Sequence, residues 1–372
     1  MIYFDNAATT LVKPECVIKA NDYALKNLCA NAGRGSHAAS MKAASLVLKA
    51  REAVNDLVGA DETVFTFNCT DALNTAIFGT ARRGHIITTM FEHNSVLRPL
   101  EELRRRGVIN YTVVKPDVNG VINPADIEKA ITRDTYMIIA NHISNVSGVV
   151  APVAAIGIIA KKHGLIYLID GAQSVGYDDT DMRRLGCDML CFAPHKGLHG
   201  VQGIGCLCVR KNVNINPIRF GGTGTSSHSI EQPSEIPEGL ESGTLPVNAI
   251  YSLISAINHY KSLGIVEKRN LAECGNFIRQ ELGKIQKVKL YGKYNLLPNI
   301  VCFNIDGLNA SSVGDILNDQ YEIAVRCGLH CAPLAHKYYG TLSTGAVRAS
   351  LSYHNTPAEA QLFIKSVYEI AK

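Results

Sequence analysis

The segment Leu165-Ile166-Tyr167-Leu168-Ile169-Asp170-Gly171-Ala172-Gln173 joins a continuous apolar run to a polar turn. A short apolar run of this kind, bounded by turn residues, is typical of a strand buried on both faces. Similar runs recur at 64–67, 86–89, 111–114, 136–140, 189–193 and 204–209. We expect helices between them at 71–80, 95–106, near 124 and at 152–163. Apolar strands that alternate with helices predict an α/β fold, whose mainly parallel sheet of seven strands is covered on both faces.

The pattern changes after residue 210. A glycine-rich segment at 221–227 is followed by helices, by short strands at 300–305 and 346–351, and by a final amphipathic helix at 357–371. We therefore predict two domains. The large domain comprises 13–245, and the smaller α+β domain comprises 1–12 and 246–372.

The composition is that of an ordinary globular protein, with 47% hydrophobic and 19% charged residues among 372. The net charge of +4 is too small to predict binding to nucleic acid or to an anionic membrane. The longest apolar stretch, 149–160, is shorter than the roughly 20 residues of a membrane span. The first residues lack a signal-peptide pattern, and eleven cysteines in a chain of this length do not indicate a disulfide scaffold. We therefore expect a cytoplasmic protein.

Several common site signatures are missing from the sequence. No Gly-Lys pair is followed by Ser or Thr, which excludes a Walker A loop. The closely spaced glycines at 200–205 precede a predicted strand, whereas a dinucleotide-binding loop opens a helix. The pairs Cys187/Cys191 and Cys327/Cys331 have no second group of metal ligands near them, so we expect no metal site.

Polar residues follow four of the predicted strands, at the edge where an open α/β sheet binds ligands. They are Asp170, His195 with Lys196, Cys69 with Thr70, and His93. One such residue alone is ordinary, because aspartate often caps a helix and a lone lysine usually lies on the surface. Four sets at one sheet edge predict a binding site.

This set suits pyridoxal 5'-phosphate. The cofactor needs a lysine for a Schiff base, a carboxylate beside its pyridine nitrogen, and a helix N-terminus for its phosphate. Lys196, Asp170 and the Cys69-Thr70 turn could supply these groups, and His93 could stack on the ring.

The order and spacing of several blocks resemble the class V aminotransferase-fold family, and specifically cysteine desulfurases and selenocysteine lyases. The resemblance covers nearly the whole chain and implies the pyridoxal-phosphate-dependent transferase fold of type I. The blocks are Tyr3-Phe4-Asp5-Asn6-Ala7-Ala8-Thr9-Thr10, Glu92-His93-Asn94, His142-Ile143-Ser144-Asn145-Val146-Ser147-Gly148, Asp170-Gly171-Ala172-Gln173, His195-Lys196, Glu241-Ser242-Gly243-Thr244, Val325-Arg326-Cys327-Gly328-Leu329-His330-Cys331-Ala332 and Val347-Arg348-Ala349-Ser350.

The resemblance implies a set of cofactor contacts. Lys196 would form the Schiff base, Asp170 would pair with the pyridine nitrogen, and His93 would stack on the ring. Gln173 and Asn145 would lie beside the ring hydroxyl. The implied phosphate contacts are Thr70, the Cys69 backbone, His195 and, reaching across a homodimer interface to the partner's phosphate, Thr244.

The resemblance also implies substrate contacts. Arg348, helped by Asn145, would hold the substrate carboxylate, and Cys331 would be the nucleophile on a loop. Arg34 and Arg326 would lie near the mouth of the site. A cation near Cys331 would lower the pKa of its thiol, and the candidates close in sequence are Arg326, His330 and His336.

Two departures from the family pattern bear on the phosphate site. Ala193-Pro194 stands before His195-Lys196 where relatives often carry a serine that binds phosphate. Cys69 stands where Ser or Thr is usual. We therefore expect weaker cofactor binding, or another donor such as the 221–227 loop.

The implied reaction is that of a pyridoxal-phosphate-dependent cysteine desulfurase. It converts L-cysteine to L-alanine, leaves the sulfur as a persulfide on Cys331, and passes it to an acceptor, possible acceptors including a protein. Selenocysteine lyase is the first alternative, because the residues alone do not separate L-selenocysteine from L-cysteine. Another class V reaction (an aminotransferase, an epimerase or a kynureninase-like enzyme) is the second, and a non-catalytic pyridoxal-phosphate-binding protein is the third.

Overall fold

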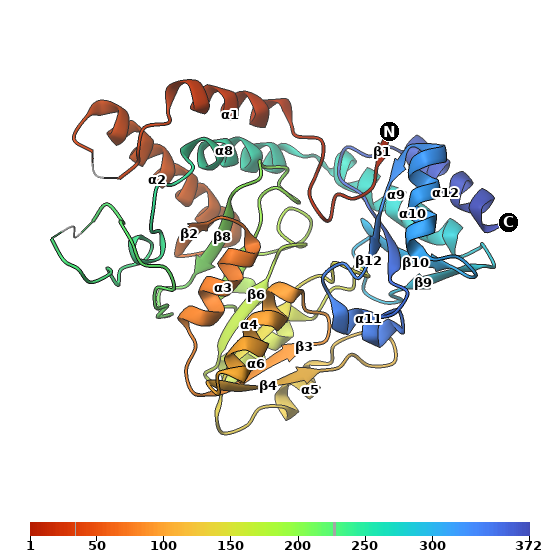
Figure 1. The fold of residues 1–372 in the computed structure, drawn as a ribbon, viewed down its shortest axis with the longest axis horizontal. Coiled ribbons are helices and arrows are strands. Elements are labelled where there is room, and N and C mark those ends of the chain that lie inside the picture. The colour runs from red at the N-terminus through yellow and green to blue at the C-terminus, as the bar shows by residue number, and fades with distance from the viewer. Residues whose placement is uncertain (34, 226–227) are drawn as a thin grey trace.

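The computed structural model describes residues 1–33, 35–225 and 228–372 (Figure 1). Its central sheet contains β2 (Glu62–Thr66), β3 (Gly84–Thr89), β4 (Ile109–Val114), β5 (Thr135–Asn141), β6 (Ile166–Asp170), β7 (Met189–Phe192) and β8 (Gly205–Val209). The strand order is β2-β8-β7-β6-β5-β3-β4. All pairs from β4 to β7 are parallel, and β8 pairs antiparallel with both β7 and β2. The predicted seven-stranded, mainly parallel sheet is confirmed.

Helices cover both faces of this sheet. The helices of the first part of the chain are α1 (Glu15–Asn27), α2 (Ala38–Val58), α3 (Cys69–Gly79), α4 (Asn94–Arg105), α5 (Pro124–Lys129), α6 (Val153–Lys162) and α7 (Met182–Leu185), and α8 (Val247–Ser262) follows the sheet. On β5, Ile138 belongs to one apolar cluster with residues of α2, α6 and α8, whereas Met137 and Ile139 belong to another with residues of α3 and α4. Alternate residues of a strand face opposite sides, so strands covered on both faces are apolar throughout.

A second sheet lies in the C-terminal part of the chain. It contains β9 (Val288–Tyr291), β10 (Ile300–Ile305), β12 (Arg326–Gly328) and β13 (Ala346–Ser350), which are antiparallel in the order β12-β13-β10-β9. The helices α9 (Ile265–Leu282), α10 (Ala310–Tyr321) and α12 (Pro357–Ala371) share one apolar cluster with it, and α11 (Pro333–Tyr339) lies between β12 and β13 in sequence.

The N-terminus lies with this C-terminal part (Figure 1). Strand β1 (Ile2–Tyr3) pairs in parallel with β11 (Ile323–Ala324), and Phe4 is fully buried among residues of α9, α10 and α12. Helix α8 packs against α1 and α2. The division at residue 245 stays a prediction. No helix within the described ranges is long and apolar enough to cross a membrane.

Candidate active site

A cavity of about 210 Å³ lies at the carboxyl edge of the central sheet, and it gathers most of the predicted site residues. Its lining includes Cys69, Thr70, His93, Asn145, Asp170, Gln173, His195, Lys196, Arg326, Cys331 and Arg348. Ser95, Asn68 and Asn141 also line it, although we did not predict them as site residues, and so does His330, a predicted neighbour of Cys331. We call this cavity the lysine pocket. Asp170, Lys196 and His93 meet here because the parallel strands that precede them end at the same edge.

Asp170 and Lys196 follow the neighbouring strands β6 and β7 into the lysine pocket. Asp170 is the last residue of β6 and is buried, and its Oδ1 accepts a hydrogen bond from the backbone N–H of Ala172 at 2.9 Å. Burial raises the pKa of Asp170, and the Ala172 N–H and the Lys196 amine oppose that rise. Burial lowers the pKa of Lys196, which favours the neutral amine that a nucleophile or base requires.

Helix α3 presents its N-terminus to the lysine pocket. The helix begins at Cys69, two residues before the predicted start, because the Asn68 side chain caps it by accepting from the Asp71 N–H at 2.9 Å. The backbone N–H groups of Cys69 and Thr70 therefore lie in the first turn, where a helix binds phosphate. The thiol of Cys69 is buried, and burial raises its pKa well above the usual value. The thiol stays neutral, so the contribution of Cys69 to an anion site would come from its backbone.

His93 is the N-cap of α4, and this position fixes its tautomer. Its Nδ1 accepts from the backbone N–H of Ser95 at 3.0 Å, so the proton of the neutral ring lies on Nε2. Burial, together with the nearby positive charge of Lys196, lowers the pKa of His93 to about 4. The Ser95 hydroxyl lies 2.8 Å from the same Nδ1 and 2.7 Å from Thr70 Oγ1. Ser95 thus joins the helix N-terminus to the histidine, and no sequence pattern that we used had marked it.

Arg348 and Asn145 leave polar groups without partners in the lysine pocket. Arg348 is 1% exposed, and its Nη1 donates to the Asn145 carbonyl at 2.8 Å. Its Nε has no hydrogen-bond partner among the described residues, and neither has the buried Oδ1 of Asn145. An unpaired buried polar group costs free energy. The Arg348 Nε–H therefore suits an anionic group of a ligand, and the Asn145 Oδ1 suits a hydrogen-bond donor of a ligand. A pyridoxal phosphate bearing an amino acid has this chemistry, and the lysine pocket fits that cofactor.

Cys331 reaches the lysine pocket on a loop with unusual backbone angles. Its φ is +56° and that of His330 is +49°, a region that non-glycine residues seldom adopt. The Cys331 side chain is exposed, and its carbonyl accepts from the Asn94 N–H at 2.7 Å. Burial lowers the pKa of His330 to about 3 and that of His336 to about 4. The expectation that either histidine is a cation near Cys331 is therefore wrong, and Arg326 is the remaining candidate of the three.

One of the predicted residues that the structure describes, Thr244, does not join the others. Thr244 lines a separate cavity of about 700 Å³, together with Arg51, Glu241 and the described part of the glycine-rich loop, Gly222–Thr225. These loop residues therefore do not line the lysine pocket of their own chain, where we expected a replacement phosphate donor. Arg34 lies outside the described residues, as do residues 226 and 227 of the loop.

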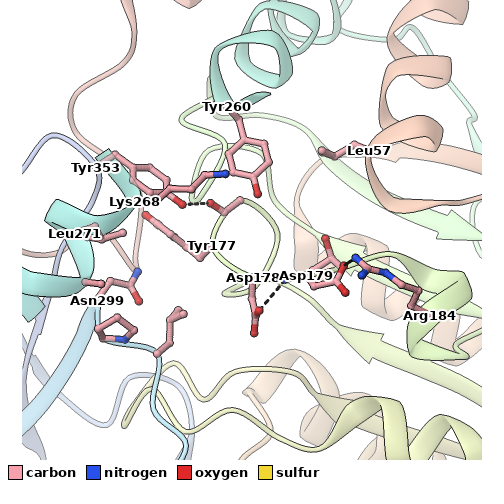
Figure 2. Close-up of a pocket in the computed structure, with 15 residues that line it drawn as sticks. Leu57, Tyr177, Asp178, Asp179, Arg184, Tyr260, Lys268, Leu271, Asn299 and Tyr353 are labelled. Carbon is pink, nitrogen blue, oxygen red and sulfur yellow. Dashed lines mark hydrogen bonds and ion pairs between the residues drawn. The ribbon is translucent and has the colours of Figure 1, made fainter. Parts of the chain in front are cut away.

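A third cavity, of about 510 Å³, holds none of the predicted site residues (Figure 2). Asp179 pairs with Arg184 at 2.5 Å, and the Tyr353 hydroxyl donates to the Gly176 carbonyl at 2.6 Å. Several polar groups that line this cavity thus already have ion-pair or hydrogen-bond partners. Across the described ranges, no group of three or more His, Cys, Asp or Glu residues is placed to hold a metal ion.

Comparison with known proteins agrees with this geometry. The aminotransferase class-V family profile matches residues 2–363. A probable cysteine desulfurase of Methanothermobacter thermautotrophicus is 35% identical, over 100% of this chain and 94% of its own length. The cysteine desulfurase IscS of Escherichia coli is 33% identical, over 98% of this chain and 91% of its own length. An apo structure of a cysteine desulfurase from Thermococcus onnurineus matches with a TM-score of 0.92 and 31% identity, over 100% of this chain and 94% of the other.

The profile and the relatives each span nearly the whole chain, so the likeness includes both sheets and the lysine pocket. Enzymes of this family depend on pyridoxal phosphate. The chain belongs to the class V aminotransferase family.

Proposed function

We propose that this protein is a pyridoxal-phosphate-dependent cysteine desulfurase. The observation that carries the proposal is that an exposed thiol, Cys331, lines the same pocket as Lys196, Asp170 and Arg348. The first two residues suit the cofactor and the arginine suits an amino-acid carboxylate, but only sulfur chemistry needs the thiol. The names of the relatives support the same assignment.

The cofactor would be held by the residues that we described at the sheet edge. Asp170 would pair with the pyridine nitrogen and His93 would cover the ring, while Gln173 and Asn145 would face the ring hydroxyl. The first turn of α3 would bind the phosphate through the N–H groups of Cys69 and Thr70 and the Thr70 hydroxyl, and His195 lines the same pocket. When bound, pyridoxal phosphate supplies an electron sink for bond breaking at the substrate Cα.

The side chains around the substrate would then each have a separate role. Arg348 would orient the substrate carboxylate with its remaining N–H groups, which suit a planar carboxylate better than a lysine would. The lowered pKa of Lys196 favours an amine that can take the Cα proton and return it. The Nε2–H of His93 would donate a hydrogen bond to the bound cofactor or substrate, and the unpaired Oδ1 of Asn145 would accept one.

Sulfur transfer is the step assigned to Cys331. Its thiolate forms a bond to the substrate sulfur while the bond between that sulfur and the substrate Cβ breaks. The electrons of the broken bond stay with the carbon skeleton, which takes up a proton and leaves as L-alanine. The protein keeps the sulfur as a persulfide on Cys331, ready for transfer to an acceptor thiol, for which a sulfur-acceptor protein is a candidate. Arg326 lies in the same pocket and supplies a positive charge near this step.

A homodimer and a cytoplasmic setting complete the proposal. Thr244 lies outside the lysine pocket of its own chain, so a contact with phosphate would be made in the partner subunit. All eleven cysteines are free thiols, which suits a reducing compartment.

The test is alanine release from L-cysteine and from L-selenocysteine, with dithiothreitol present. Cys331→Ala is compared with Cys327→Ala, a matched control, because burial raises the pKa of Cys327 to about 11. We expect Cys331→Ala to lose cysteine turnover and keep selenocysteine turnover, since a selenol leaves more readily. Cys327→Ala should keep both.

Other outcomes would change the assignment. Alanine from selenocysteine alone in the wild type would make the protein a selenocysteine lyase. No alanine from either substrate would leave an aminotransferase, an epimerase or a kynureninase-like reaction, or a non-catalytic role if no cofactor Schiff base forms.

A further inference from the structure

Three residues behind Cys331 form a buried chain of hydrogen bonds. His330 Nε2 lies 3.2 Å from the Arg326 carbonyl, and His330 Nδ1 lies 3.2 Å from His336 Nε2. His336 Nδ1 lies 2.8 Å from the Thr341 hydroxyl. The two imidazole rings are stacked with centroids 5.4 Å apart, and all three side chains belong to residues no more than 3% exposed. His336 and Thr341 do not line the lysine pocket, so they touch neither substrate nor cofactor there.

The donor and acceptor properties of these groups fix the direction of every hydrogen bond that links them. A carbonyl oxygen only accepts, so His330 Nε2 carries its proton. Burial lowers the pKa of both rings to about 3 and about 4, so each is neutral and has one acceptor nitrogen. His330 Nδ1 therefore accepts from His336 Nε2–H, and His336 Nδ1 accepts from the Thr341 hydroxyl. All four ring nitrogens are then satisfied, and removing the Thr341 hydroxyl leaves one of them unpaired.

This chain of hydrogen bonds includes His330, and both His330 and its neighbour Cys331 have left-handed backbone angles. A non-glycine residue in the left-handed region is strained, and His330 and Cys331 both lie there. Such a conformation persists only when its surroundings hold it. The Asn145 amide donates to the His330 carbonyl at 2.6 Å, and the Asn94 N–H donates to the Cys331 carbonyl at 2.7 Å. The side chain of His330 is the third anchor, and the buried chain orients it.

We propose that His336 and Thr341 are positioning residues for the sulfur nucleophile. Through the His330 ring they hold the His330-Cys331 peptide in its left-handed conformation, which places the Cys331 thiol at the lysine pocket. This inference rests on the proposed function, because that function gives the thiol its target. A histidine pair that only filled space would depend on ring shape and not on the hydroxyl at position 341.

The experiment compares Thr341→Val, which keeps the shape and removes the hydroxyl, with Thr341→Ser, which keeps the hydroxyl. The measurements are kcat for L-cysteine, kcat for L-selenocysteine, the rate of Cys331 alkylation by iodoacetamide, and the urea midpoint. We expect Thr341→Val to lower kcat for cysteine roughly tenfold or more, since small misplacements of a reacting group have effects of that size. Selenocysteine turnover should stay within about twofold, the alkylation rate should change several-fold, and Thr341→Ser should restore the wild-type values.

A second pair tests the neighbouring bond. His336→Gln keeps an N–H donor for His330 Nδ1, whereas His336→Leu does not, so the glutamine variant should retain more cysteine turnover. The proposal is overturned if Thr341→Val matches the wild type in cysteine turnover and alkylation. It is also overturned if Thr341→Val lowers both turnovers and the urea midpoint together, because that is a general structural defect. If the wild type makes no alanine, the proposed function fails, and the alkylation rates still decide whether the buried chain positions Cys331.

Discussion

The Arg348 guanidinium donates from Nη2 to the carboxylate of Asp5 at 2.6 Å. Arg348 lies on β13 and Asp5 lies just after β1, so this pair ties the N-terminal segment to the lysine pocket. The arginine is fully buried, and the carboxylate compensates for its charge and fixes its orientation. Asp5 is therefore a support for the proposed substrate-carboxylate site.

Replacing Asp5 by asparagine should weaken substrate binding. The change keeps an acceptor for Arg348 and removes the charge, and a hydrogen bond to a charged group is worth about 1.5–3 kcal/mol. We expect Asp5→Asn to raise KM for L-cysteine about tenfold, which corresponds to about 1.4 kcal/mol, with a smaller effect on kcat. Steady-state kinetics on the cofactor-loaded enzyme measure both. Asp22→Asn on the exposed face of α1 is the control, and an equal KM for the two variants would contradict the role given to Asp5.

Glu92 should make the fold less stable as the pH rises. Its carboxyl is fully buried, and burial raises its pKa from 4.5 to about 8. Between these values the unfolded chain releases the proton and the folded chain keeps it. The free energy of unfolding therefore falls with rising pH, by up to about 1.4 kcal/mol per pH unit.

Glu92→Gln tests this linkage. Glutamine can still accept from the Thr89 hydroxyl and the Asn141 N–H, and it cannot ionise. We expect the variant to gain stability relative to the wild type from about pH 5 to about pH 8 in urea unfolding. A difference between the two proteins that does not change with pH would show that Glu92 keeps an ordinary pKa.

The ring of His93 should carry its proton on Nε2 at neutral pH. The Ser95 N–H occupies Nδ1, and burial keeps the pKa of the ring near 4. Nitrogen-15 NMR of histidine-labelled protein distinguishes the two tautomers, and loss of the signal in His93→Gln assigns it. Ser95→Ala keeps the backbone donor and should leave the tautomer unchanged. A ring protonated on Nδ1 at pH 7 would contradict the N-cap geometry.

Thr244 should act on the partner subunit. We expect Thr244→Val homodimers to lose cofactor more readily than the wild type, because the proposed phosphate contact is missing in both sites. A mixed dimer of one Thr244→Val chain and one Lys196→Ala chain should regain one tight site, because the lysine of the first chain meets the threonine of the second. Cofactor dissociation, followed by absorbance of the Schiff base, measures this. A mixed dimer that retains cofactor no better than the Thr244→Val homodimer would place Thr244 within its own site.

The sequence by itself was sufficient to predict the central sheet and the edge of that sheet at which the site lies. Each strand is a local apolar run, and the polar residues that follow β6, β7 and β3 need only the rule that parallel strands end together. Asp170, Lys196 and His93 could thus be placed in one pocket before any distance was known. The resemblance of the C-terminal blocks added Arg348 and Cys331.

The tertiary structure decided the protonation states of these residues and the partners that orient them. His330 and His336 lie close to Cys331 in sequence, so we predicted them as candidate cations. Burial makes both rings neutral, and burial depends on the whole fold. Arg348 is held by a residue 343 positions away, and no local pattern encodes such a pairing. Apolar periodicity is a property of neighbouring residues, so it can be read along the chain. Protonation and orientation depend on the dielectric and the partners that only the packed chain supplies.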